Sequence, residues 1–271
     1  MTVKCAGIYV IGELLMKRIK LTVAYDGTHY NGWQVQPNGI TIEGMLNKAI
    51  TELTGETVSV TGASRTDSGV HALGNVAVFD THTKIPPEKL SYALNQRLPE
   101  DIVVQHSCEV PPHFHPRRCE SRKTYVYKVL NRTFPLPLNR HDCYFTYRKL
   151  DVGQMRRAAA YLVGTHDFKS FCSIHTQAET TVRTIYELSV EKEQDLITIR
   201  ITGSGFLYNM VRIIAGTLMQ AGIGERSPEQ MQEILHAKDR SAAGPTAPAH
   251  GLTMIGISFA ADHSNNILEN I

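Results

Sequence analysis

Apolar side chains recur along this chain with two different periods, and the period changes several times. Residues 17–25 alternate apolar and polar positions, which predicts a strand with one buried face. Residues 42–54 place apolar side chains three and four positions apart, which predicts a helix that begins after Thr41 and ends at Gly55. The remaining patterns of this part predict strands near 57–61, 74–80 and 101–110 and a helix at 87–97.

The second part of the chain shows the same order of elements. Its patterns predict strands at 123–130, 182–192, 196–203 and 251–259, and helices at 151–164, 208–221 and 228–237. The first part therefore has the order β-α-β-β-α-β of the ferredoxin-like arrangement, and the second part repeats it with two helices before its last strand, although no residue-by-residue repeat accompanies it. We predict an α+β fold of two ferredoxin-like halves, whose antiparallel sheets lie side by side and enclose a central cleft.

These patterns divide the chain into an N-terminal extension at 1–15, an N-terminal half at 16–112 and a C-terminal half at 113–271. The extension precedes the first predicted strand, and we expect it to be dispensable, with Met16 as an alternative start. It contains Glu13 and lacks an Ala-x-Ala type cleavage site, so we interpret it as neither a signal peptide nor an anchor.

Composition narrows the class of protein. Of the 271 residues, 42% are hydrophobic and 20% are charged, as is typical of a soluble globular protein. No apolar run reaches the roughly 18 residues that a membrane-spanning helix needs. The five cysteines are scattered and form no C-x-x-C pair, which argues against a disulfide framework and favours the cytoplasm.

Charge is unevenly distributed, although the net charge is only +2. Residues 113–157 include 11 Lys or Arg and 3 Asp or Glu. Such a basic segment is either a solvated face or a phosphate-binding surface, because clustered cations release counterions from nucleic acid. Rings that stack on bases in RNA complexes are interleaved with these cations. They are Tyr125, Tyr127, Phe134, Tyr144, Phe145 and Tyr147.

The segment "GASRTDSGVH" at 62–71 places an arginine and an aspartate between two predicted strands. Asp-Ser-Gly is favourable turn chemistry, so a plain turn explains Asp67 by itself. Binding and catalytic groups also concentrate on loops held by a rigid scaffold, which favours a site residue. Both interpretations remain open from this segment alone.

Six segments together resemble the tRNA pseudouridine synthase A family. They are "AYDGTHYNGWQVQ", "RTDSGVHA", "KTYVYKVLN", "GTHDFKSF", "FLYNMVRIIAGTL" and "APAHGL", and the resemblance runs from Met16 to Phe259. It implies isomerisation of uridine to pseudouridine in the anticodon stem-loop of tRNA, at tRNA positions 38–40. It also implies two RRM-like halves, a homodimer, and no metal or organic cofactor. The chain departs from the family pattern at Ser64, Asn75 and Glu43, where Gly, Gln and Gln are usual.

The resemblance assigns roles to four residues. Asp67 matches the nucleophile, and a carboxylate suits a reaction that breaks the bond between a sugar and a base. Whether it attacks C1′ or C6, or assists at C2′, stays open. Tyr125 matches a tyrosine that contacts the uracil, and Arg212 a basic residue that keeps the aspartate ionised. Arg65 matches an arginine that engages RNA as the target base leaves the helix.

Five further residues are predicted to bind RNA: His71, Arg117, Arg118, Arg122 and Lys123. A hydrogen-bonded structural role is the alternative for the histidine. Trp33 and Tyr127 are expected to pack in the core.

Two other classes of function remain as alternatives. A non-catalytic RNA-binding protein would explain the basic segment, but not Asp67, Tyr125 and Arg212 together. A metal-dependent nucleobase hydrolase or deaminase is suggested by His113, His115 and Cys119. The deaminase pattern, however, combines H-x-E with a downstream P-C-x-x-C, and neither occurs in this chain.

Overall fold

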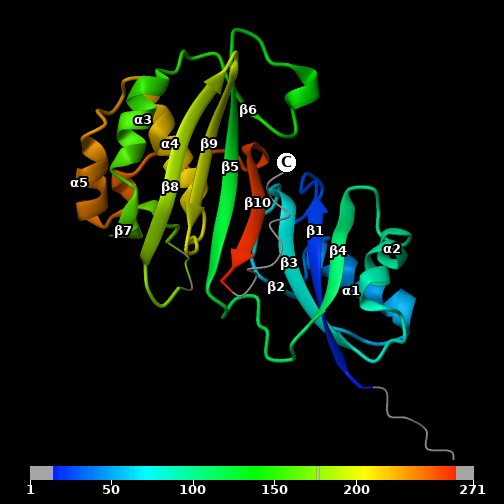
Figure 1. Cartoon of the computed structure of the whole chain (residues 1–271). Helices are drawn as coiled ribbons and strands as arrows, with labels where there is room; N and C mark the ends of the chain where they lie inside the picture. The colour runs from blue at the N-terminus through cyan, green and yellow to red at the C-terminus, as the bar shows by residue number, and fades with distance from the viewer. Residues whose placement is uncertain (1–14, 175, 177, 261–271) are drawn as a thin grey trace, which may run out of the picture.

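The structure is a computed structural model that describes residues 15–174, 176 and 178–260 (Figure 1). The predicted extension at 1–15 therefore lies almost wholly outside the described residues. The described strands are β1 (Lys17–Tyr25), β2 (Thr61–Gly62), β3 (His71–Thr81), β4 (Ile102–Val110), β5 (Ser121–Asn131), β6 (Tyr144–Thr146), β7 (Gly164–Asp167), β8 (Val182–Glu193), β9 (Leu196–Gly203) and β10 (Leu252–Phe259). The α-helices are α1 (Ile42–Thr54), α2 (Leu90–Asn95), α3 (Val152–Ala160), α4 (Met210–Gly222) and α5 (Gln230–Ala237).

The strands form one continuous sheet in the order β4-β1-β3-β10-β5-β9-β8-β7, with β2 beside β3 and β6 beside β5. Strand β10, drawn in red, lies between β3 and β5 (Figure 1). It pairs parallel to β3 at Thr253–His71 and Met254–Ala72, and antiparallel to β5. The α+β class is confirmed. The division into halves at 16–112 and 113–271 stays a prediction, since the last strand joins both parts in one sheet.

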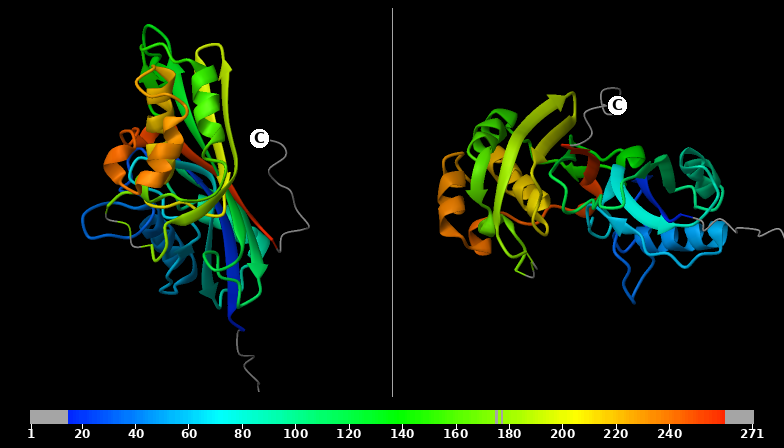
Figure 2. Two further views of the ribbon diagram at one scale, coloured as in Figure 1. Left: turned by 90° about the vertical axis from the view of Figure 1, so that its left-hand side faces the viewer. Right: turned by 60° about the horizontal axis from the view of Figure 1, so that its bottom comes forward.

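The helices lie in two groups along this sheet (Figure 2). Helices α1 and α2 lie at the β1–β4 end, and α3, α4 and α5 at the β7–β9 end. Apolar side chains of β1 alternate as predicted, and Ile19, Leu21 and Val23 are fully buried. Burial of such side chains on both sides of β10 makes one hydrophobic cluster that positions the loops between the strands. No helix within the described residues is long and apolar enough to span a membrane.

The end signals of helix α1 behave as the sequence predicts. The Thr41 hydroxyl accepts a hydrogen bond from the Gly44 N–H, and Gly55 adopts a left-handed conformation at φ +75°. At the start of α5, the Ser227 N–H donates to the Gln230 side chain at 2.9 Å, which is half of a capping box.

Two predicted elements are shorter than expected. The strand predicted at 57–61 contributes only Thr61 to β2, and the Val60 N–H donates to the Asn47 side chain of α1 instead of a neighbouring strand. The helix predicted at 87–97 is a 3-10 turn followed by α2. It ends at Asn95, whose side chain exchanges two hydrogen bonds with the Val104 backbone of β4.

The helix predicted at 151–164 ends at Ala160, and residues 164–167 form strand β7 instead. Gly164 has φ +111°, a conformation that favours glycine and breaks the helical path. Strands β6 and β7 are both short and were not predicted, because three or four residues carry too little pattern to identify a strand.

Candidate active site

An open cleft of about 1040 Å³ is lined by several separate parts of the chain, three of which carry the predicted site residues. The loop between β2 and β3 contributes residues 63–68, strand β5 contributes Lys123 and Tyr125, and the segment that enters α4 contributes residues 206–212. Residues from both predicted halves therefore line the cleft. The cleft contains all four residues to which the family resemblance assigned a direct role.

Asp67 is held at this cleft by a tight turn. Its carbonyl accepts a hydrogen bond from the Val70 N–H at 3.1 Å, and Gly69 takes the left-handed conformation at φ +76°. Gly32 packs directly on the loop, where a Cβ would lie 2.7 Å from the Thr66 carbonyl oxygen. The turn that explains Asp67 structurally thus also presents its carboxylate, which is 22% exposed, to the cleft.

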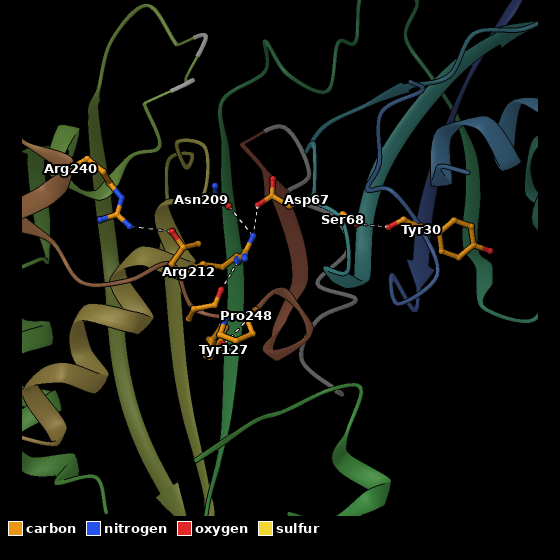
Figure 3. Close-up of polar contacts among 10 residues, drawn as sticks. Tyr30, Asp67, Ser68, Tyr127, Asn209, Arg212, Arg240 and Pro248 are labelled. Atoms are coloured by element: carbon orange, nitrogen blue, oxygen red, sulfur yellow. Dashed lines mark hydrogen bonds and ion pairs between the residues drawn. The ribbon is translucent and has the colours of Figure 1, made fainter. Parts of the chain in front are cut away.

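Arg212 pairs with Asp67, as the sequence predicts (Figure 3). Its Nη1 lies 3.4 Å from Oδ2 of Asp67 and donates to the Asn209 side chain at 2.9 Å. Its Nε donates to the Ala247 carbonyl at 2.7 Å. Burial raises the pKa of Asp67, and the Arg212 charge opposes that rise. The arginine is fixed on three sides and favours an ionised carboxylate.

Tyr125 forms a wall of the cleft from strand β5. Its ring packs edge-to-face against Phe206, with ring centroids 5.2 Å apart, and only 6% of the residue is exposed. Its hydroxyl lies 2.7 Å from the Ser64 hydroxyl. Burial, with a smaller contribution from the Asp67 charge, raises the pKa of Tyr125 to about 12. The phenol is therefore neutral near pH 7 and can serve as a hydrogen-bonding group.

The loop that carries Asp67 is held by further contacts that the sequence analysis missed. The Thr66 hydroxyl lies 2.7 Å from the Tyr25 hydroxyl, and the Asn75 side chain donates to the Ser64 carbonyl at 3.0 Å. The polar Asn75 in the middle of an apolar strand was a usable signal, because such a residue needs buried partners. Of the loop residues 63–67, Arg65 alone is exposed and makes no hydrogen bond or ion pair with any described residue.

The other predicted RNA contacts separate into two groups. Arg117 and Lys123 line the cleft, and Arg183, which the sequence analysis missed, lines it as well. Arg118 and Arg122 are exposed outside the lining, and the Arg122 guanidinium lies 4.5 Å from the centroid of the Tyr186 ring. A cation on β8 lies far along the sequence from the basic segment, so no local pattern marked Arg183.

His71 lies away from the cleft lining and is largely buried. Its Nδ1 is 3.0 Å from Asp26 and 3.1 Å from the Gly27 N–H, and its Nε2 is 3.2 Å from the His250 carbonyl oxygen. These contacts tie β3 to the turn that precedes β10. They match the structural alternative for this histidine more closely than an RNA contact.

The described residues contain no group of three or more His, Cys, Asp or Glu side chains placed to hold a metal ion. The side chains that line the cleft include one carboxylate, Asp67, and several cations. The cations are Arg65, Arg117, Lys123, Arg183 and Arg212. A carboxylate beside a tyrosine wall, in a cleft otherwise positive, is the arrangement expected of an enzyme that acts on a base of a nucleic acid.

Comparisons with known proteins specify this class. A family model described as tRNA pseudouridine synthase matches residues 21–117 and 158–260. The tRNA pseudouridine synthase A of Thermoanaerobacter sp. (strain X514) is 49% identical over 244 residues, which cover 90% of this chain and 100% of that protein. The tRNA pseudouridine synthase A of Bacillus subtilis (strain 168) is 49% identical over 245 residues, which cover 89% and 99%. The chain therefore belongs to the tRNA pseudouridine synthase family, and it is an isomerase that acts on tRNA.

Proposed function

We propose that this protein converts uridine to pseudouridine in the anticodon stem-loop of tRNA, at tRNA positions 38–40, with Asp67 as the nucleophile. The observation that carries the proposal is the Asp67–Arg212 pair at 3.4 Å, inside a cleft whose other charged lining groups are all cationic. The cations favour an RNA backbone, and the lone carboxylate among these described residues favours chemistry at the sugar and base.

Pseudouridine formation breaks the bond from C1′ to N1, turns the uracil, and joins C5 to C1′. C5 loses its proton in this step and N1 gains one. The reaction conserves atoms and oxidation state, so it needs no electron acceptor or energy input. Its demand on the protein is a charged group beside the sugar and a surface that holds the loose base. Asp67 meets the first demand, with Arg212 keeping it ionised, and the Tyr125 ring meets the second.

The target base must leave its stack before it can reach Asp67, which costs a few kcal/mol. Arg65 is placed for that step, because it lies two residues from Asp67 and its side chain is exposed without a protein partner among the described residues. The rigid contacts of Ser64 and Thr66 on either side keep the carboxylate in place while Arg65 moves. Arg118 and Arg122 would contact the RNA farther from the cleft.

We further propose a cytoplasmic homodimer. Cys119, Cys143 and Cys172 are free thiols, which agrees with a reducing compartment. The connection between β5 and β6 exposes Phe134 and Leu138, whose exposed fractions are 72% and 93%. A second copy of the chain would cover such apolar side chains. Light scattering of an active preparation should give twice the chain mass, and an active monomer would contradict the dimer.

The test of the proposed function is a map of pseudouridine in unmodified tRNA transcripts after incubation with the pure protein. We expect new pseudouridine confined to tRNA positions 38–40. Pseudouridine elsewhere in the tRNA would contradict the anticodon-stem assignment. Tight binding of tRNA without any product would instead favour the non-catalytic alternative.

A further inference from the structure

Two of the cleft cations lie close enough to a third, Lys123, to act on its charge, and the three come from three different elements. Arg117 belongs to the connection between β4 and β5, Lys123 to β5, and Arg183 to β8. None of the three has a carboxylate within ion-pair distance among the described residues. Arg212 differs from these three cations, because it forms an ion pair with Asp67.

Lys123 is the most enclosed of these cations. Its ammonium donates one hydrogen bond, at 2.8 Å, to the Ala63 carbonyl at the start of the loop that carries Asp67. An ammonium has three donors, so two remain for another partner. Burial, and after it the neighbouring charges of Arg117 and Arg183, together lower the pKa of Lys123 to about 8.

Arg183 also uses part of its guanidinium for hydrogen bonds within the protein. Its Nη1 donates to the Thr180 and Val182 carbonyls at 2.9 and 2.6 Å, which fixes the guanidinium plane. Its Nε and Nη2 make no hydrogen bond with any described residue, so these two nitrogens can donate to a bound ligand. A guanidinium held in this way is suited to a two-point contact with an oxyanion.

Grouping three cations without a carboxylate costs electrostatic free energy, which an incoming anion recovers. The position of the group decides which anion. Lys123 and Tyr125 lie two residues apart on one face of β5, which separates their backbones by roughly 7 Å. A base against Tyr125 therefore brings a phosphate of its own nucleotide or of its neighbour into reach of Lys123.

We propose that Arg117, Lys123 and Arg183 form a subsite for one backbone phosphate of the RNA, adjoining the nucleotide whose base lies against Tyr125. The subsite rests on the proposed function, because it takes the target nucleotide to be in this cleft. It is distinct from the Asp67–Arg212 pair, which acts on the sugar and base. The hydrogen bond from Lys123 to the Ala63 carbonyl also links the bound phosphate to the loop that carries Asp67.

The test uses RNA stem-loops that carry one neutral methylphosphonate, moved in turn through the phosphates that flank the target uridine. Binding is measured in an Asp67→Asn background, so that turnover does not interfere. At one position we expect the methylphosphonate to weaken binding about tenfold, the scale of a charge-assisted hydrogen bond. Lys123→Met and Arg183→Met should each weaken binding of the unmodified RNA to a similar extent.

The decisive comparison combines each variant protein with the modified RNA. If the subsite exists, the methylphosphonate at that position weakens binding to Lys123→Met or Arg183→Met less than it weakens binding to the parent, because part of the phosphate contact is already lost. Lys123→Arg keeps the charge and should stay sensitive to the methylphosphonate. Arg97→Met, an exposed arginine after α2, is the matched control and should behave as the parent does.

Equal losses in the parent and in both variants at every position would overturn the subsite while leaving the proposed function intact. Failure of the wild-type protein to bind or convert the unmodified RNA would overturn both. Thermal unfolding of each variant confirms that the comparison is between folded proteins.

Discussion

The guanidinium of Arg212 lies 3.4 Å from the carboxylate of Asp67, although the two residues are 145 positions apart in the chain. The aspartate comes from the loop between β2 and β3, and the arginine from the first turn of α4. The pair therefore links the loop between β2 and β3 to helix α4 as well as setting the charge of the site. Both residues are mostly buried, with exposed side-chain fractions of 22% and 17%.

Replacing Arg212 with Met should lower both activity and stability. The change leaves a mostly buried carboxylate without its partner and also leaves the Ala247 carbonyl without its donor. We expect a loss of about 3 kcal/mol in the free energy of unfolding, the lower end of the range for a broken buried pair. Denaturant unfolding measures it, with exposed Arg157→Met as the control. Equal stability of the two variants would show that the pair contributes nothing.

The pH dependence of activity should report the same pair. Burial raises the pKa of Asp67, so its folded-state pKa lies above its ordinary value. The resulting contribution to stability is present below the unfolded-state pKa of about 3.9 and is lost as the pH rises through the folded pKa. Activity has the opposite sign, because the nucleophile must be ionised, so kcat/KM falls as the pH falls through the folded pKa.

Removal of the Arg212 guanidinium charge should shift this low-pH fall in kcat/KM to a higher pH. Arg212→Gln takes away the group that lowers the pKa of Asp67, so its residual kcat/KM should begin to fall at a higher pH than in the wild type. A profile with an unchanged midpoint would mean that the fall belongs to another group.

The hydroxyls of Ser64 and Tyr125 should be energetically coupled. Ser64→Ala leaves the buried Tyr125 hydroxyl without its 2.7 Å partner, at a cost of about 1–3 kcal/mol in the free energy of unfolding. Tyr125→Phe removes the orphaned group, so the double variant should lose less than the sum of the single variants. Simple additivity in this cycle would contradict a direct bond.

RNA binding should weaken as the pH rises from 7 to 9. Lys123 has a pKa lowered to about 8, and the charged groups that act on it, Arg117 and Arg183, stay cationic over this range. Deprotonation removes one charge from the proposed phosphate subsite. Lys123→Arg should abolish the dependence, since arginine stays charged. A wild-type dissociation constant that is constant over this range would contradict the contribution of Lys123.

Much of the fold could be predicted from the sequence, because long strands and helices have clear periods. Strand β1 and helix α1 begin and end where the alternation and the Thr41 and Gly55 signals place them. The insertion of β10 between β3 and β5 could not be predicted, since strand order depends on contacts between distant segments. Periodicity is a local property and carries no information on which strands become neighbours.

The site was predicted where one short motif or the family resemblance marked a residue. Asp67, Arg212 and Tyr125 meet in one cleft as expected. Arg183 and the bond between Tyr25 and Thr66 were missed, because each depends on the three-dimensional path of a strand. A hydroxyl on the buried face of β1 gives no sign in the sequence that a loop 41 residues later needs it.

The most direct test of the central claim is the turnover of Asp67→Asn. This change keeps the shape of the side chain and removes its charge. Asp80→Asn is the matched control, because Asp80 also pairs with an arginine, Arg18, at 2.7 Å but lies outside the cleft lining. Pseudouridine formed in unmodified tRNA is measured for both variants, together with tRNA affinity. We expect Asp67→Asn to form no pseudouridine while its tRNA affinity stays close to that of the wild type, and Asp80→Asn to remain active. Appreciable product from a contamination-free preparation of Asp67→Asn would contradict the assignment of Asp67 as the nucleophile.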